Sequence, residues 1–295
     1  MGILVHVLLQ AMAVMTNLTQ MDPKFEPLLG SLSKNSIPLE IQKPVVIPDA
    51  SSTSAPVSDD AGRNPKAVPQ LTGDLAQYQS YIQQGQETLA EIKELMNRDG
   101  WKTSRKDKVG TIVKYLFHPK YNRRIFMTTA VFPAPPEILY RVIWTEGGEM
   151  HKWNPKIEDV EILQPIGDIA QISRQVAANE AGGIVTQRDF VVLNERDEED
   201  GPLGKIYYVA YVSTEWPGRP PLEDFVRAEN GPSGFRFEPI EGNPDATKVT
   251  WIFNADLKFD HLPATMLNAV LPASTLNYMS SLRKHLEEMK SKGEF

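Results

Sequence analysis

The sequence predicts an α+β fold in which one long helix covers a single curved antiparallel sheet. Most of the chain between residues 101 and 258 consists of short β-rich runs joined by short turn signals, which favours consecutive antiparallel strands. One helical pattern precedes these runs, and a longer helical pattern follows them. A layer of helix on a layer of sheet is the simplest arrangement that buries the apolar side of each.

Length and composition exclude several classes of protein. The chain has 295 residues, a formal net charge of −7 and no Cys, so disulfides and thiolate metal sites are excluded. The acidic balance argues against a general nucleic-acid binder, because no basic field would neutralise phosphates. No apolar run reaches the roughly 18 residues that are needed to span a bilayer. The lack of Cys suits a reducing compartment, and we expect a cytoplasmic protein.

Residues 1–70 are predicted to form a disordered leader, and residues 71–295 the folded domain. The segment 16–70 contains eight Pro and a run of Ser and Thr at 51–54, a composition that buries too little apolar surface to offset its ordering entropy. Residues 3–15 resemble the apolar core of a signal peptide. However, no Lys or Arg precedes them and no clear cleavage site follows. A docking or sorting role for the leader stays open.

The first helix is predicted to run from about residue 72 to residue 96. Thr72 or Asp74 can cap it, apolar residues follow at helical spacing, and the segment 97–100 ends it. Two strands follow at 110–117 and 124–132. A short helix is then predicted to open at Pro135, because a missing N–H is harmless in the first turn.

Seven further strands and one long helix complete the predicted domain. The strands are predicted at 157–163, 170–177, 183–193, 205–212, 222–229, 234–238 and 248–258. The acidic run 195–200 is predicted to be a solvated hairpin tip. The final helix is predicted from about Pro263 to Lys290, with a stripe of Leu, Val and Met. Pro272 lies inside it and predicts a bend, because it removes one backbone hydrogen bond.

The sequence carries no recognisable catalytic or metal-binding pattern. No two of its five His are three or four positions apart, so no metal site is predicted. A nucleophile elbow, a phosphate-binding loop and a dinucleotide fingerprint are all absent. We therefore expect a non-enzymatic protein without a cofactor.

Several separated motifs resemble the START lipid-transfer domains. They are Trp153-Asn154-Pro155, residues 181–185, Arg188-Asp189-Phe190-Val191, residues 226–232 and residues 251–258. The similarity covers about residues 75–290. Within the family the chain is most similar to the cholesterol-carrying branch, and in particular to a carotenoid-binding insect member. The resemblance implies a helix-grip START fold, in which the sheet curves around an apolar tunnel and the last helix closes it.

Three positions depart from the cholesterol-carrying branch. The resemblance places its cavity acid at Gln175, its cavity arginine at Asn194 and a cavity serine at Val209. Losing both charges together leaves no buried unpaired charge, and it makes the cavity less costly to dry out for a hydrocarbon. We expect Gln175 and Asn194 to hydrogen-bond a terminal hydroxyl of the ligand. The alternative that the two amides bond each other stays open.

Further ligand-lining residues are predicted on the strands and on the last helix. They are Phe190, Tyr208, Trp251, Phe253, Met266, Leu267, Val270, Leu271, Asn277 and Met279. Ordinary core packing is the alternative for each of them. Pro272 is predicted to be a hinge of the gate. Trp216, in the loop 216–221, is predicted to be a second gate residue that contacts a membrane interface. Arg188 and Asp189 are predicted to be structural and to pin the loop before them.

The resemblance implies a non-enzymatic intracellular carrier that binds one carotenoid, such as lutein, and transfers it between membranes. A sterol carrier of the same fold is the alternative. An enzyme acting on an apolar substrate and an interaction module working through the leader stay open. We expect a monomer that contacts membranes transiently, binds no nucleic acid and forms a dimer only when ligand promotes one.

Overall fold

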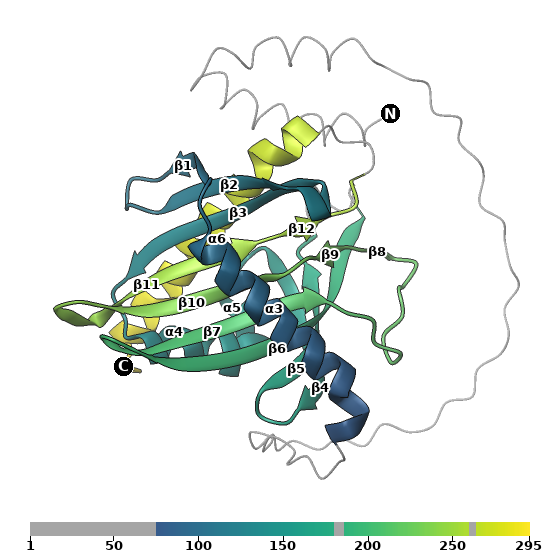
Figure 1. Cartoon of the computed structure of the whole chain (residues 1–295), viewed down its shortest axis with the longest axis horizontal. Coiled ribbons are helices and arrows are strands. Elements are labelled where there is room, and N and C mark those ends of the chain that lie inside the picture. The colour runs from purple at the N-terminus through teal and green to yellow at the C-terminus, as the bar shows by residue number, and fades with distance from the viewer. Residues whose placement is uncertain (1–74, 180–185, 260–263) are drawn as a thin grey trace, which may run out of the picture. The chain divides into compact units, whose positions relative to one another are not determined.

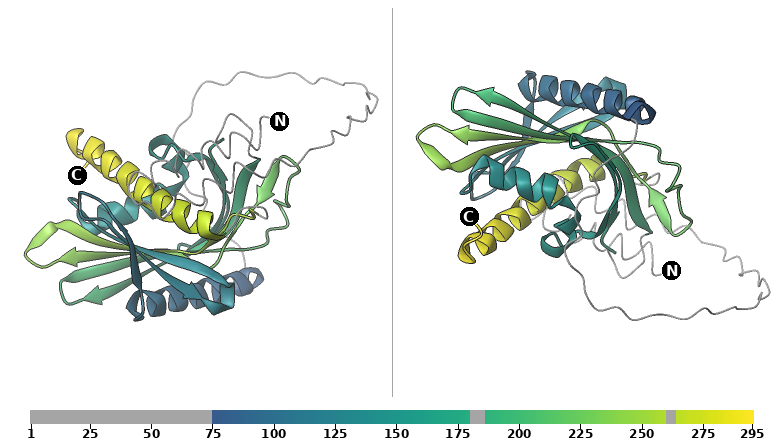
Figure 2. Two further views of the ribbon diagram at one scale, coloured as in Figure 1. Left: turned by 90° about the horizontal axis from the view of Figure 1, so that it is seen from above. Right: turned by 90° about the horizontal axis from the view of Figure 1, so that it is seen from below.

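A sheet of ten strands lies at the centre of the described residues 75–179, 186–259 and 264–295 of this computed structural model (Figure 1). Helix α3 (Gln79–Asn97) lies on one face of the sheet and helix α6 (Ala264–Ser291) on the other, as the turned views show (Figure 2). The predicted leader, the predicted caps Thr72 and Asp74, and the motif 181–185 lie outside the described residues. Within the described ranges, no helix has both the length and the apolar character that crossing a bilayer requires.

The remaining helical segments are short; the first leads into α3, and the others lie between strands. They are η2 (Leu75–Tyr78), η3 (Pro119–Tyr121), α4 (Pro136–Tyr140), η4 (Arg141–Thr145), η5 (Gly147–Glu149) and α5 (Met150–Trp153). The strands are β1 (Lys102–Lys106), β2 (Ile112–His118), β3 (Arg123–Phe132), β4 (Ile157–Ile166), β5 (Ala170–Ala177), β6 (Gln187–Gly201), β7 (Gly204–Ser213), β8 (Phe225–Arg227), β9 (Glu229–Asn230), β10 (Ser233–Ile240), β11 (Asn243–Phe253) and β12 (Ala255–Asp256).

The strand order is β1-β2-β3-β11-β10-β7-β6-β5-β4, and β8 pairs with β6 at the side of this path. Strands β9 and β12 form a separate two-stranded sheet. Register shifts within β1–β2, β4–β5 and β10–β11 mark bulges or irregular pairing. Bulges increase local twist and bend, which helps the large sheet to curve around α6.

Most predicted elements are confirmed, with boundaries shifted by a few residues. The predicted helix 263–290 is α6, and the predicted strand 170–177 is β5. The first helix ends at Asn97 as expected, and Gly100 follows with φ 91°. The last helix shows the expected stripe because Leu, Met and Thr recur at helical spacing on its buried side.

The acidic run 195–200 is a correction, because it forms part of a strand and not a hairpin tip. Strand β6 continues to Gly201 and pairs with β7 along this whole run. The Nζ of Lys93 on α3 donates to the carboxylates of Asp197 at 2.7 Å and Glu199 at 3.2 Å. The charges are therefore partly neutralised against a helix, and Glu195 is only 4% exposed.

Three further differences concern strand pairing. The predicted strand 222–229 is two short pieces, β8 and β9, and β8 runs parallel to β6, contrary to the purely antiparallel prediction. The predicted strand 183–193 is observed from Gln187. Strand β1 was not predicted, because Lys-Thr-Ser-Arg-Lys lacks the apolar alternation on which strand prediction depends.

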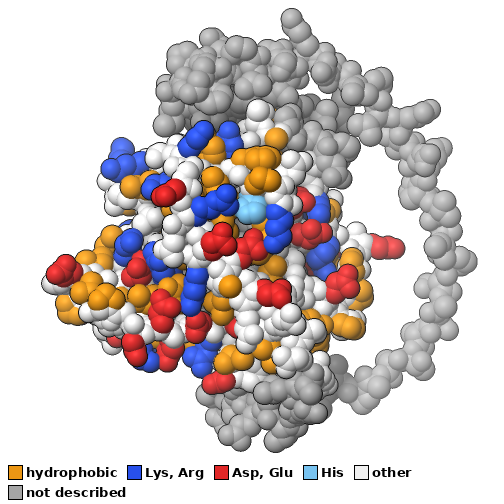
Figure 3. All heavy atoms as spheres, viewed as in Figure 1, with side chains coloured by type: hydrophobic (Ala, Val, Ile, Leu, Met, Phe, Trp, Pro, Cys, Tyr) orange, Lys and Arg blue, Asp and Glu red, His pale blue; other side chains and the backbone are white. Residues whose placement is uncertain are grey.

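Strand alternation gives the sheet two different faces. On β11, Val249 and Trp251 belong to the core beneath α6, whereas Ile252 belongs to the core beneath α3. The α3 face is closely packed. At Gly234 an added Cβ would lie 2.6 Å from the Val209 carbonyl oxygen and 2.7 Å from Cδ1 of Ile92. The charged groups seen from this side are of both signs (Figure 3).

Candidate functional site

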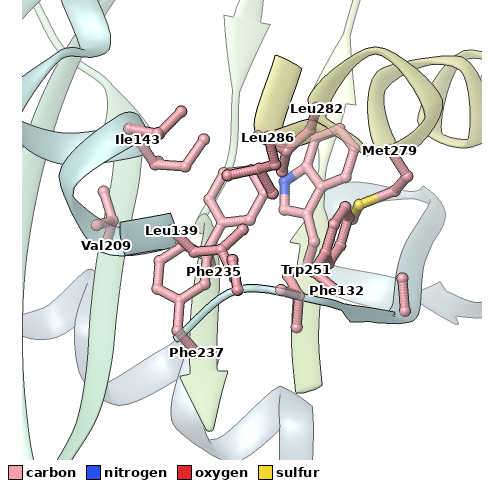
Figure 4. Packing of buried hydrophobic residues seen from close by; sticks show 14 of the residues in the cluster. Phe132, Leu139, Ile143, Val209, Phe235, Phe237, Trp251, Met279, Leu282 and Leu286 are labelled. Carbon is pink, nitrogen blue, oxygen red and sulfur yellow. The ribbon is translucent and has the colours of Figure 1, made fainter. Parts of the chain in front are cut away.

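The face of the sheet beneath α6 is apolar and rich in aromatic side chains. Its main buried cluster consists of Ala130, Phe132, Ala134, Leu139, Val142, Ile143, Val209, Phe235, Phe237, Val249, Trp251, Met279, Leu282, Leu286 and Met289. Figure 4 shows side chains of α6, among them Met279, Leu282 and Leu286, meeting the aromatic side chains of the strands. We call the strand side of this cluster the aromatic floor, namely Phe132, Phe235, Phe237 and Trp251.

Aromatic stacking organises the floor. The ring of Phe235 lies 5.1 Å from that of Trp251 and 5.9 Å from that of Phe237, with interplanar angles of 11° and 5°. Tyr278 of α6 lies on top, with its ring 4.8 Å from Trp251 and 5.9 Å from Phe235. Trp153 closes one side of Tyr278 in an edge contact at 5.6 Å. These separations are typical of favourable aromatic pairs.

A few hydroxyl groups interrupt this apolar surface. The indole Nε1 of Trp251 donates to the Tyr211 hydroxyl at 2.9 Å. Burial raises the pKa of Tyr211 and raises that of Tyr278 well above its ordinary value, so both phenols stay protonated. Tyr278 Oη and Thr128 Oγ1 are shut off from solvent and have no hydrogen-bond partner among the described residues. The face therefore offers aromatic surface together with two unused hydroxyls.

The first half of α6 covers a second, smaller cluster. It contains Val113, Phe126 and Leu271, with Tyr115, Phe253, Leu257, Leu267 and Leu276 packed against it. Pro272 is buried within the continuous helix. It has no N–H for the carbonyl of Asn268, four positions earlier. One position on, the Arg105 side chain on β1 donates to the Ala269 carbonyl at 3.1 Å. This bond holds α6 to β1 next to the carbonyl that lacks its helical hydrogen bond.

The three positions that depart from the cholesterol-carrying branch lie on the α6 side. Val209 is in the main cluster, and strand alternation places Gln175 and Asn194 on the same face. The two amides do not face each other, because Asn194 lies opposite Gln171, and Gln175 lies opposite Phe190. Asn194 Nδ2 donates to Ser173 Oγ at 2.8 Å. The N–H groups of Asn194 are therefore already used within its own sheet.

Several predicted lining residues do lie together beneath α6. Trp251 and Met279 are in the main cluster, Phe253 contacts both clusters, and Leu267 and Leu271 are in the smaller one. Met266 is buried and Phe190 is half-buried. A ligand at these positions stays a prediction.

Three predicted lining residues are corrected by the structure. Tyr208 is on the α3 face, where Lys93 lies over its ring and its hydroxyl donates to Glu199 at 2.7 Å. Val270 is 39% exposed and Asn277 is exposed. The last two are seven positions apart, two helical turns, and so share the solvent side of α6. Tyr208 and Val209 are neighbours on one strand, and alternation alone would have excluded one of them.

The predicted gate residue Trp216 lies on the other side of the sheet. Its ring is 5.8 Å from that of Tyr81, within the cluster beneath the start of α3. It borders a groove of about 920 Å³, which is lined by residues of α3, of the segment 212–221 and of the segment 227–232. Lining residues of both charge signs, including Glu87, Glu91, Arg219 and Arg227, make this groove less suited to an apolar ligand than the aromatic floor.

Asp189 has a structural position, as the sequence predicted. It is fully buried and accepts hydrogen bonds from Nε of Arg174 and Nε of Arg227, each at 2.8 Å. Burial works to raise the pKa of Asp189, but the bonds from Arg227 and Arg174 outweigh it and keep that pKa below its ordinary value. This ionic clasp joins β5, β6 and β8. Its neighbour Arg188 donates to the Leu257 carbonyl at 3.2 Å.

Prediction from sequence missed Tyr278, Tyr211 and Thr128. Strand alternation places Tyr211, two positions after Val209, on the α6 face. Thr128 lies directly opposite Trp251 on the neighbouring strand and therefore shares its face. The helical stripe that contains Met279 includes Tyr278 as well. Among the described residues, no group of three or more His, Asp and Glu is arranged to hold a metal ion.

The chain is similar in sequence to known proteins. A family model described as "START domain" matches residues 82–292. The Danio rerio protein "Steroidogenic acute regulatory protein, mitochondrial" is 33% identical over 209 residues, covering 70% of this chain and 71% of that protein. The Homo sapiens protein of the same name is 32% identical over 209 residues, with the same coverage of both chains.

Solved structures show the same fold. Human StAR-related lipid transfer protein 5 aligns with a TM-score of 0.63 at 24% identity, covering 72% of this chain and 98% of that one. The human StarD13 lipid transfer and protein localization domain aligns with a TM-score of 0.51 at 23% identity, covering 66% and 94%. Because the family model spans most of the chain and relatives above 30% identity cover 70% of it, this chain belongs to the START domain family.

Proposed function

We propose that this chain is a non-enzymatic carrier that holds one sterol, or a lipid of similar chemistry, between the sheet and α6. The observation that carries the proposal is the aromatic floor, which α6 covers together with the short helices α4 and η4. Such a surface recognises hydrocarbon by area and not by charge. The name of the relatives, steroidogenic acute regulatory protein, supports a steroid-related cargo for this chain.

The energetics favour a carrier of this kind. Removing several hundred Å² of apolar ligand surface from water, at about 25 cal/mol per Å², exceeds ordinary association costs. The ligand must displace part of α6 to enter, because the helix packs on the floor in the described structure. The bend expected at Pro272 supports the part of α6 around that residue as the segment that opens.

A carotenoid is the second candidate, because Gln175, Asn194 and Val209 give the α6 face neutral groups where the cholesterol-carrying branch is expected to have charges and a hydroxyl. A neutral face costs less to dry out along a long polyene. Under either reading we propose transient membrane contact, a monomer in the free state and a dimer only when ligand promotes one. The names of the relatives include "mitochondrial", whereas we propose the cytoplasm for this chain; cell fractionation decides between the two.

Gel filtration of the full chain with lipid tests the proposal. The protein is mixed with labelled cholesterol, with lutein, or with both in competition, and the eluted protein is analysed for bound lipid. About one cholesterol per chain supports the sterol carrier. A visible polyene band that co-elutes and resists cholesterol supports the carotenoid carrier. Protein that elutes free of both lipids contradicts both readings, and an enzyme or an interaction module then becomes the better explanation.

Two matched variants sharpen the choice between the ligands. Val209→Ser places a hydroxyl on the α6 face, whereas Ala210→Ser places one on the α3 face. If the face selects hydrocarbon, Val209→Ser weakens lutein binding more than cholesterol binding, and Ala210→Ser changes the ratio of the two affinities little. Deleting residues 1–66 separates a carrier, which keeps its lipid, from an interaction module, which loses its partner.

A further inference from the structure

The strongest unexplained feature of the α6 face is a buried phenol without a partner. Tyr278 Oη has no hydrogen-bond partner among the described residues and no contact with solvent. A buried hydroxyl that is left unpaired costs about 1–3 kcal/mol, so most such groups in proteins are bonded. A phenylalanine at this position would keep the ring contacts and avoid that cost.

The surroundings of Tyr278 define the group that would satisfy it. Its ring lies against Trp251, Phe235 and Trp153, so no acceptor comes from these aromatic rings. The indole N–H of Trp251 is already used by Tyr211. Tyr211 lies close by, because both phenols contact the rings of Phe235 and Trp251. Burial raises the pKa of Tyr278, so it is a protonated donor among aromatic side chains and beside a second phenol.

The local charge limits what this donor can bind. Within the described ranges, the side chains that pack on the Tyr278 ring are those of Trp153, Phe235 and Trp251, and none of these carries a charge. A carboxylate or phosphate on the ligand would therefore be buried without a cation, which is strongly unfavourable. A neutral hydroxyl needs no cation, and it can accept from Tyr278. Sterols and xanthophylls share this group.

Asn194, which the sequence suggested as the hydroxyl anchor, differs from Tyr278 because its donor groups are already bonded. Its amide already donates to Ser173 Oγ at 2.8 Å and lies 3.3 Å from the Gln171 carbonyl. A ligand hydroxyl that accepts a hydrogen bond from Asn194 would have to replace an existing bond, whereas at Tyr278 it would make a missing one. Of these two residues, the one with an unused donor is therefore Tyr278, in the middle of α6.

We propose that Tyr278 donates to the hydroxyl of the carried lipid, with Tyr211 beside it, so that the polar end of the lipid lies beneath α6. The hydrocarbon then extends over the aromatic floor. This inference rests on the proposed carrier function and specifies the end of the ligand that α6 recognises. Because Tyr278 is on α6, the bound lipid links α6 to the aromatic floor.

The test compares lipids that differ only in the hydroxyl. Binding to the full chain is measured for cholesterol and for cholest-5-ene, which lacks the 3-hydroxyl, and likewise for lutein and β-carotene. The two pairs of lipids distinguish a sterol source from a carotenoid source. We expect the wild type to prefer the hydroxylated lipid of the relevant pair by about tenfold, the effect of one net hydrogen bond.

Tyr278→Phe removes only the donor, and we expect it to abolish this preference by weakening the hydroxylated lipid while leaving the other unchanged. Tyr208→Phe is the matched control. It removes a phenol hydroxyl from the α3 face, where the ring lies beneath Lys93, and should leave the preference at about tenfold. The melting temperature of lipid-free Tyr278→Phe should be unchanged or higher, because an unpaired hydroxyl has been removed.

Two results would overturn the inference while leaving the carrier function intact. One is a Tyr278→Phe variant that binds lipid and keeps the full preference. The other is a lower melting temperature of the lipid-free variant, which would mean that Tyr278 has a partner in the free protein. If the wild type binds none of the four lipids, the carrier function fails, and the inference fails with it.

Discussion

The two faces of the sheet differ in how their hydroxyl groups are used. On the α3 face the hydroxyls of Tyr208 and Thr88 are bonded: the first donates to Glu199 and the second to the Gln84 carbonyl. An unpaired group on that face is instead a carboxyl oxygen, Oε2 of Glu195. On the α6 face, Thr128 and Tyr278 are left without partners beside an aromatic floor. A face that is only structural gains from satisfying every hydroxyl. This contrast in the hydroxyls supports the proposal that the α6 face receives a lipid while the α3 face is structural.

The largest expected effect is on the α3 face, from Gly234→Ala. The new Cβ would lie 2.6 Å from a backbone carbonyl oxygen and 2.9 Å from Cα of Ala210, neither of which can rotate away. We expect a loss of about 3 kcal/mol in the free energy of unfolding, measured by urea denaturation. Gly147→Ala is the matched control, because an added Cβ there meets nothing within 4 Å. Equal stability of the two variants would contradict the close packing of α3.

A pH effect of intermediate size is expected from Glu195, also on the α3 face. Burial, and then Asp197, raise the pKa of Glu195 to about 7. The folded protein therefore holds a proton that the unfolded chain releases near pH 4.5. The resulting stability is complete below that pH and is lost as the pH rises through 7. Between pH 5 and pH 8 we expect a loss on the order of 2 kcal/mol.

Glu195→Gln should remove this loss, as measured by urea denaturation at both pH values. The variant keeps the shape of the Glu195 side chain. This matters because the side chain packs closely against α3, where a Cβ added at Gly85 would lie 2.7 Å from Cδ of Glu195. Every other ionisable group is the same in both proteins and cancels in the comparison. A glutamine variant that loses as much stability as the wild type would show that Glu195 is charged throughout this range.

A smaller effect distinguishes the hydroxyls of the two faces directly. Thr128→Val removes an unpaired Oγ1 from the α6 face without changing its shape, and should raise the free energy of unfolding by about 1 kcal/mol. Thr88→Val removes an Oγ1 that donates to the Gln84 carbonyl at 2.7 Å, and should not raise it. Thermal or urea unfolding of both variants measures the difference. A stabilised Thr88→Val variant would mean that the contrast between the faces is not one of hydrogen bonding.

The smallest effect is expected on the rate of lipid exchange. Pro272→Ala restores an N–H for the Asn268 carbonyl and stiffens α6, so lipid transfer between vesicles should slow by about threefold. Ser274→Ala, an exposed change on the same helix, serves as the control. An unchanged transfer rate would remove the hinge from the mechanism and leave α6 to open as a rigid unit.

Much of the architecture could be predicted from sequence, because it depends on local periodicity. The stripe of α6 and the alternation of β10 and β11 follow from apolar residues at spacings of 3.6 and 2. β1 has no such pattern. The burial of Glu195 depends on the close approach of Gly85 on a distant helix and on the extension of β6, which local composition does not reveal.

The candidate site was less predictable, because it depends on register and on missing partners. That Asn194 meets Ser173 follows from the β5–β6 register, which the sequence alone does not fix. Val270 and Asn277 were predicted to face inward, whereas the residues that follow them, Leu271 and Tyr278, are the ones in contact with the sheet. An error of one position changes the direction of a helical side chain by about 100°. Whether Tyr278 has an acceptor depends on all its neighbours together, and such an absence has no sequence signal.

The strand order has a consequence for how the chain is made. Strands β3 and β11 are neighbours in the sheet, and nearby Thr247 donates to the Ala134 carbonyl across 113 positions of the chain. A ribosome therefore releases Phe132 long before the other three residues of the aromatic floor, which lie on β10 and β11. Helix α6 follows every strand, and its 28 residues take about 1 to 6 s to synthesise. During that interval the floor lacks the cover of α6, so its aromatic side chains are accessible to a lipid or a chaperone.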